Sequence, residues 1–137
     1  MKLFRILISV VLVIAMSAFS ARAQEPKTPE QQEKELREAI DKEIDKYIRT
    51  LDIDMAQEFY LDSILTHDYF AMRDEIMEKS RAKVNNMDVY QAIQDKWAER
   101  IYVAFRKVLD DEQWEKYLKG GAGREKKARD KREAKRK

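Results

Sequence analysis

Residues 90–108 read YQAIQDKWAERIYVAFRKV, and the fold class follows from the spacing of the large apolar side chains in this stretch. They recur at steps of three and four residues, at Tyr90, Ile93, Trp97, Ile101, Ala104, Phe105 and Val108. Such spacing places them on one side of a helix, whereas a half-buried strand would alternate apolar and polar residues. The stretch therefore predicts an amphipathic helix with one buried face.

The chain before this stretch has the same period. A first helix is predicted to begin at Thr28-Pro29-Glu30-Gln31, with Thr28 as N-cap and Pro29 at the first helical position. A second is expected to follow Asp52 as its N-cap, either continuous or broken near Thr66. The side chains expected to supply the core include Leu36, Ile40, Ile44, Tyr47, Leu51, Phe59, Tyr60, Leu65, Tyr69, Phe70, Met72, Ile76, Trp97, Phe105 and Trp114.

Glycine is absent from the region that carries these patterns. Gly120, Gly121 and Gly123 stand together after it, and hairpin turns need residues that tolerate a positive φ, usually Gly or Asn. Only Asn85 and Asn86 meet that need, so a sheet is not expected. We predict an all-α fold, a small antiparallel helical bundle or bent helical hairpin of four to five helices with a charged C-terminal tail.

Charge and hydropathy divide the 137 residues into three regions. Residues 1–23 resemble a secretory signal peptide, with basic Lys2 and Arg5, an apolar run over 6–15, and Ala21 and Ala23 as the A-x-A cleavage site. Residues 24–119 are the expected helical domain, and 120–137 are a glycine hinge and basic tail, disordered or a frayed helix. We therefore expect an exported protein, periplasmic or extracellular, with no transmembrane span in the mature chain.

The chemistry expected of enzymes is largely missing. The chain has no Cys and one His, which excludes thiol nucleophiles and multi-histidine metal sites. Ser63 and His67 are four residues apart, but nothing nearby supplies the orienting group and oxyanion hole that a nucleophile needs. Asp52 and Asp54 lack the Gly and distal Glu of an EF-hand loop. We expect no enzymatic activity, no cofactor and no resident metal.

One local motif resembles a known family. Leu109-Asp110-Asp111-Glu112-Gln113 has the form Leu-[Thr/Asp]-x-x-Gln, in which Asp110 and Gln113 form a helix capping box and Leu109 precedes it. Repeated Leu-Thr-x-x-Gln motifs in a small, exported, charged helical chain resemble the periplasmic Spy/CpxP-type family. That resemblance implies a bent helical-hairpin dimer acting as an ATP-independent chaperone or envelope-stress adaptor. It transfers no individual binding residue.

The basic tail is the second candidate site. Residues 119–137 hold ten Lys or Arg and three Asp or Glu, whereas residues 24–118 hold fifteen and twenty-three. The tail residues proposed to bind an anionic surface are Arg124, Lys126, Lys127, Arg129, Lys131, Arg132, Lys135 and Arg136. The alternatives are a solvated tail that aids solubility and a tail that folds back on the acidic body.

Three functional hypotheses follow. The first is a helical envelope protein that binds unfolded or stress-related client proteins and forms a homodimer. The second is a structural or adhesive protein whose tail binds anionic envelope polymers or lipid head groups; export makes nucleic acid the less expected partner. The third is a metal- or stress-sensing accessory domain.

Overall fold

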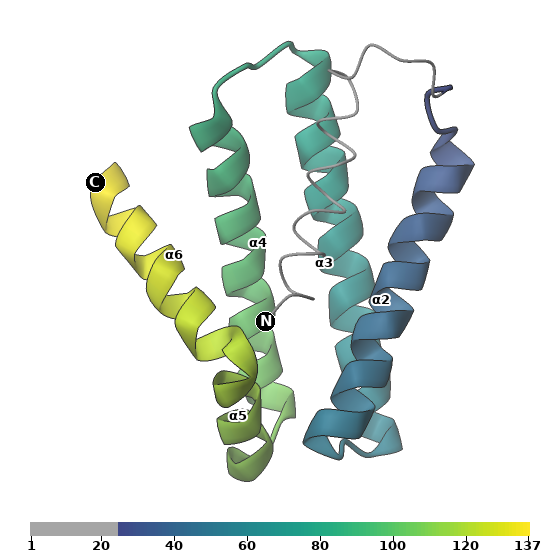
Figure 1. Cartoon of the computed structure of the whole chain (residues 1–137), viewed down its shortest axis with the longest axis vertical. Coiled ribbons are helices and arrows are strands. Elements are labelled where there is room, and N and C mark those ends of the chain that lie inside the picture. The colour runs from purple at the N-terminus through teal and green to yellow at the C-terminus, as the bar shows by residue number, and fades with distance from the viewer. Residues whose placement is uncertain (1–24) are drawn as a thin grey trace.

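The computed structural model describes residues 25–137 and confirms the all-α prediction, since these residues form helices and no strand. The elements are α2 (Pro29–Leu51), α3 (Met55–Arg81), α4 (Met87–Val108), α5 (Asp111–Tyr117), a π-helical segment η1 (Leu118–Ala122) and α6 (Gly123–Arg136). The three long helices run up and down side by side, with α3 between α2 and α4 (Figure 1). The chain then turns at α5, and α6 returns along α4.

Helix α2 begins as the sequence predicts. The Thr28 Oγ1 accepts a hydrogen bond from the Gln31 backbone N–H at 3.2 Å, and the Gln31 side chain accepts one from the Thr28 N–H at 3.0 Å. This capping box satisfies two of the donors that a helix start leaves unpaired. The side chains that α2 buries recur every three or four residues and are Leu36, Ile40, Glu43, Ile44, Tyr47 and Leu51.

Helix α3 begins two residues later than predicted, so the assignment of Asp52 as its N-cap is wrong. Asp54 is the N-cap and forms a complete box with Gln57, whereas Asp52 ends α2 in a left-handed conformation with φ of 53°. The physical reason is the side chain at the third helical position, which must bond back to the N-cap to complete a capping box. An N-cap at Asp52 would place Met55 there, which cannot return a hydrogen bond, whereas Asp54 places Gln57 there.

Helix α3 is continuous through Thr66, but part of its expected core lies in solvent. Phe59 is 67% exposed and Tyr60 is 57% exposed, so the prediction that both are buried is wrong. The buried side of α3 follows Leu61, Leu65, Asp68, Met72 and Ile76 instead. Both aromatics lie off that stripe, and they contact each other edge to face at 5.7 Å between ring centroids.

The core lies in two clusters along the layer of helices. The larger joins α2, α3, α4 and the α5 corner, and its fully buried side chains are Leu36, Ile40, Leu61, Leu65 and Phe105. The smaller joins α3 to α4 through Met72, Ile76 and Ile93. Both clusters lie on the faces that the helical period selects, so packing of those faces holds the layer together.

The chain changes direction between α5 and α6. Gly121 has a φ of 123°, a conformation that side-chain-bearing residues rarely adopt, and it interrupts the helical path inside η1. Of the states considered for the tail from sequence, the structure shows an ordered helix, α6, that folds back along α4. None of the helices in residues 25–137 combines the length and apolarity needed to span a membrane.

Candidate binding groove

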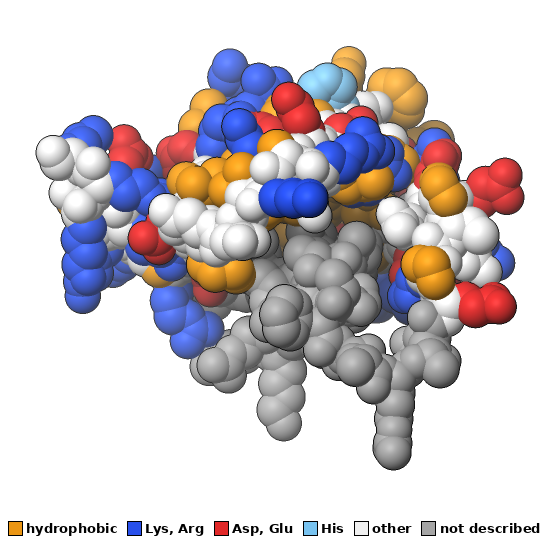
Figure 2. Space-filling view, turned by 90° about the horizontal axis from the view of Figure 1, so that it is seen from above, with side chains coloured by type: hydrophobic (Ala, Val, Ile, Leu, Met, Phe, Trp, Pro, Cys, Tyr) orange, Lys and Arg blue, Asp and Glu red, His pale blue; other side chains and the backbone are white. Residues whose placement is uncertain are grey.

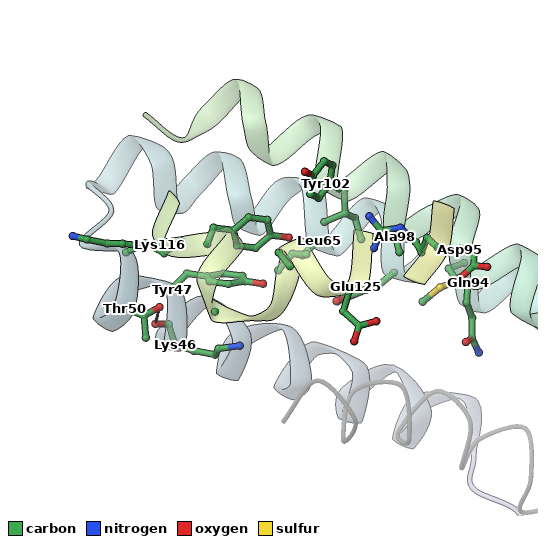
Figure 3. Close-up of a pocket in the computed structure, with 18 of the residues that line it drawn as sticks. Lys46, Tyr47, Thr50, Leu65, Gln94, Asp95, Ala98, Tyr102, Lys116 and Glu125 are labelled. Atoms are coloured by element: carbon green, nitrogen blue, oxygen red, sulfur yellow. Dashed lines mark hydrogen bonds between the residues drawn. The ribbon is translucent and has the colours of Figure 1, made fainter. Parts of the chain in front are cut away.

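A groove runs between α2 and α6, with α3 and α4 as its floor. We call it the central groove; its cavity volume is about 170 Å³. The apolar part of its lining comes from Tyr47, Leu51, Leu65, Tyr69, Met72, Ala98, Ile101, Tyr102, Tyr117 and Ala122. Figure 3 shows Tyr47, Leu65 and Ala98, which belong to three different helices, around this cavity. Residues distant in sequence thus form one largely apolar surface.

Three tyrosines of the central groove, Tyr47, Tyr69 and Tyr117, have raised pKa values and remain neutral. Burial raises the pKa of Tyr47 well above its ordinary value, and electrostatic interaction with Tyr117 and Glu43 raises it further. Burial also raises the pKa of Tyr69 and of Tyr117, and the Glu43 carboxylate adds to both shifts. The floor therefore presents aromatic carbon and protonated hydroxyls at any physiological pH, which suits uncharged segments.

One face of α6 forms a wall of this groove by pairing with α4. Lys126, Arg129, Arg132 and Arg136 make up this paired face. The Arg132 Nε and Nη2 donate to the two Asp95 carboxylate oxygens at 3.0 and 2.8 Å, and Arg136 donates to Asp95 at 2.9 Å. One turn along α4, Glu99 accepts from Lys126 at 2.9 Å and from Arg129 at 3.2 Å. Four of the eight tail residues predicted to bind an anionic surface therefore form ion pairs with acidic residues of α4.

Asp95 makes this attachment dependent on pH. Its burial alone would raise its pKa, but hydrogen bonds from Arg132, Arg136 and Gln91 outweigh burial, and the pKa of Asp95 lies below its ordinary value of 3.8. A carboxyl group whose pKa is lower in the folded state stabilises that state above its unfolded-state pKa, and the contribution is lost as pH falls through the folded-state pKa. The attachment of α6 should thus be strong at neutral pH and lost in acid.

We expect Asp95→Asn to reduce the free energy of unfolding by about 1–3 kcal/mol at pH 7, because three partly buried hydrogen bonds from Arg132 and Arg136 lose their charged acceptor. The difference from the unaltered protein should shrink as pH falls from 5 to below 3.8. Urea unfolding across that pH range measures it. Asp45→Asn, which removes an exposed carboxylate on α2, is the matched control. A difference that stays constant with pH would contradict the assignment.

The other four tail residues proposed from sequence do not take part in this attachment. Arg124, Lys127, Lys131 and Lys135 are all exposed and form no ion pair with any described residue. They recur at steps of three, four and four residues, so they share one side of α6. We call them the outer stripe. The structure therefore separates the eight predicted residues into two sets with different surroundings.

The capping motif lies at the corner between α4 and α5. Leu109 is buried, Asp110 is the N-cap, and Gln113 completes the box by accepting from the Asp110 N–H at 3.0 Å. Asp54 and Gln57, which are not predicted from the sequence as a capping box, form the same box at the corner between α2 and α3. The signal that points to them is a Gln three residues after an Asp, with Ile53 before it.

The two boxes bind each other. The Gln57 Nε2 donates to the Gln113 Oε1 at 2.6 Å, and the Gln113 Nε2 donates to the Gln57 Oε1 at 3.0 Å. Each amide also donates to the backbone carbonyl two residues before the other box's N-cap, Gln57 to Val108 and Gln113 to Asp52. This glutamine pair therefore ties the two interhelical corners together with approximate twofold symmetry.

Three further features considered from the sequence are the cleavage site, a metal site and the Ser63–His67 pair. The cleavage residues Ala21 and Ala23 lie outside the described residues. Over residues 25–137, no cluster of three or more His, Cys, Asp or Glu side chains is arranged to hold a metal ion. Ser63 and His67 lie on exposed turns of α3; the His67 Nδ1 is 2.7 Å from the Asp68 Oδ1, and the Ser63 Oγ donates to the Phe59 carbonyl instead.

Comparisons with protein-family models, with curated proteins and with solved structures find no match to this chain.

Proposed function

We propose that this is a non-enzymatic, exported binding protein, chaperone-like in action, which holds extended apolar segments of unfolded polypeptides in the central groove. The observation that supports this most directly is the groove itself, which has an apolar floor formed by α3 and α4 between walls formed by α2 and α6. Its volume of about 170 Å³ matches a few side chains of a client rather than a whole folded protein. Binding therefore depends on local apolar segments.

The rim of the central groove supports this proposal. Lys46, Lys116, Glu125 and Arg132 surround the apolar lining, and they carry both signs of charge. Such a rim keeps the open groove solvated and does not select a client of one charge. Sequence-tolerant binding needs this combination, since unfolded clients share exposed apolar side chains and little else.

The glutamine pair also supports the proposal. The Spy/CpxP-type resemblance depends on repeated Leu-Thr-x-x-Gln motifs, and the chain carries two related boxes, Leu109-Asp110-x-x-Gln113 and Ile53-Asp54-x-x-Gln57. Both have Asp in the place of Thr, and the second has Ile in the place of Leu. We include membership of an exported, stress-related chaperone class in the proposal on this ground.

The test places a charge on the groove floor. In a chain from Gln24 to Lys137, Ala98→Glu should reduce protection of a chemically unfolded client against aggregation by about tenfold, because a carboxylate resists burial under an apolar segment. Light scattering at increasing ratios of protein to client measures the protection. Circular dichroism melting verifies that the variant is folded.

Ala104→Glu is the matched control, because Ala104 lies on the same helix but lines the opposite side of the layer. It should protect as well as the unaltered chain. Equal protection by both variants would overturn the assignment to the central groove, and absence of protection by the unaltered chain would overturn the chaperone proposal. Deletion of residues 120–137 cannot replace the Ala98→Glu variant in this test, because it removes a wall of the groove together with the basic charges.

A further inference from the structure

The outer stripe is a strongly charged surface that the central groove does not use. Arg124, Lys127, Lys131 and Lys135 span twelve residues of α6, about 16 Å at the rise of an α-helix. Figure 2 shows Lys and Arg side chains gathered over the edge of the molecule where Figure 1 places α6. Neighbouring bases of the stripe are only three or four residues apart, about 4.5–6 Å along the helix, which is less than the Debye length of about 8 Å at physiological salt, so each acts together with its neighbours on a nearby surface.

The acidic residues of α6 do not neutralise this stripe. Asp130 pairs with Lys126 at 2.7 Å, and Glu133 pairs with Lys137 at 3.1 Å. Glu125, the third acid, lines the central groove. The α4 carboxylates Asp95 and Glu99 are engaged by the paired face. The stripe thus keeps its positive charge while α6 stays attached.

We infer that the outer stripe docks the protein on an anionic lipid bilayer, with α6 lying flat at the level of the head groups. A single straight row of bases at the edge of the molecule touches a flat surface along its whole length. The tail has only alanines as apolar side chains, so adsorption without insertion is expected.

A single-stranded nucleic acid fits this surface less well. Sites for single-stranded nucleic acid combine a basic groove with aromatic side chains on which bases stack. The Tyr102 ring on α4 faces α6, but it is covered by Lys126 and Arg129, whose charged groups lie 5.6 and 5.5 Å from its centroid. The outer stripe itself contains no aromatic residue.

The experiment measures partitioning of the chain from Gln24 to Lys137 onto vesicles containing phosphatidylglycerol, relative to neutral phosphatidylcholine vesicles. Replacing Arg124, Lys127, Lys131 and Lys135 by Gln should reduce partitioning about fivefold per residue, several hundredfold in all. Raising the salt concentration should weaken binding of the unaltered protein in the same direction. Gln matches Lys in helix propensity, and an unchanged circular dichroism melt verifies that α6 remains folded.

A variant with the same net charge separates the stripe from a general charge effect. Lys34, Lys42, Arg49 and Lys107 are exposed on α2 and α4, and replacing these four by Gln should change partitioning by no more than about fivefold. Equal losses in the two variants would overturn the proposal. So would a lack of preference for anionic over neutral vesicles, or binding to polyphosphate with none to vesicles. Each of these three results leaves the client assay, and so the proposed chaperone function, unaffected.

Discussion

Replacing Phe105 by Ala is expected to destabilise the protein by about 3–5 kcal/mol. Phe105 is fully buried and lies where α2, α4 and α5 meet. Its ring contacts Tyr47 edge to face at 5.5 Å and Tyr117 in a tilted geometry at 5.4 Å between centroids. Removing it leaves a cavity among rings that surrounding helices cannot close without moving the corner.

Denaturant unfolding followed by circular dichroism measures this loss. Val103→Ala is the control, because Val103 lies two residues earlier on α4 and is 47% exposed. That change should cost less than about 0.5 kcal/mol, as surface substitutions usually do. Similar losses in the two variants would show that α4 does not bury the face described here.

The glutamine pair carries the second large effect. We expect Gln113→Ala or Gln57→Ala to reduce the free energy of unfolding by about 2–3 kcal/mol, because each change removes a capping partner, breaks the bonds between the two amides and leaves one backbone carbonyl, that of Asp52 or Val108, without its donor. The double variant should cost about 1–2 kcal/mol less than the sum, since the two amides bond each other.

Gln31→Ala provides the matched control for this cycle. Gln31 occupies the same position in the α2 capping box, but it is exposed and bonds only Thr28. Its replacement should cost about 1 kcal/mol, and it should add to Gln113→Ala without coupling. Additive losses from Gln57 and Gln113 would contradict the tie between the two corners.

The three capping boxes illustrate how far sequence reasoning reaches. Two were identified because a box needs only an Asp or Thr followed three residues later by Gln, a rule that operates within one helical turn. The third was missed because Asp52 and Asp54 compete for the same role, and the choice depends on where α2 ends. Neither segment alone predicts that two of the boxes bond each other, because Gln57 and Gln113 are 56 residues apart in the sequence.

The basic tail likewise has features that the sequence predicts and features that only the tertiary structure decides. Its charge and glycine hinge were evident from composition, but the separation of eight bases into a paired face and an outer stripe required the position of α4. Asp95 and Glu99 are four residues apart on one side of that helix, and the paired bases recur every three or four residues. Complementary spacing of this kind is visible in sequence only after the two helices are known to be neighbours.

The helical class, the helix count and most of the buried positions follow from periodicity, caps and the absence of glycine in residues 24–119, because these depend on interactions within a few residues along the chain. The burial of Leu61 and the exposure of Phe59 and Tyr60 depend instead on which side of α3 meets its neighbours. The central groove and the glutamine pair likewise arise where distant helices meet. Such contacts are chosen by the packing of whole faces, which local rules do not specify.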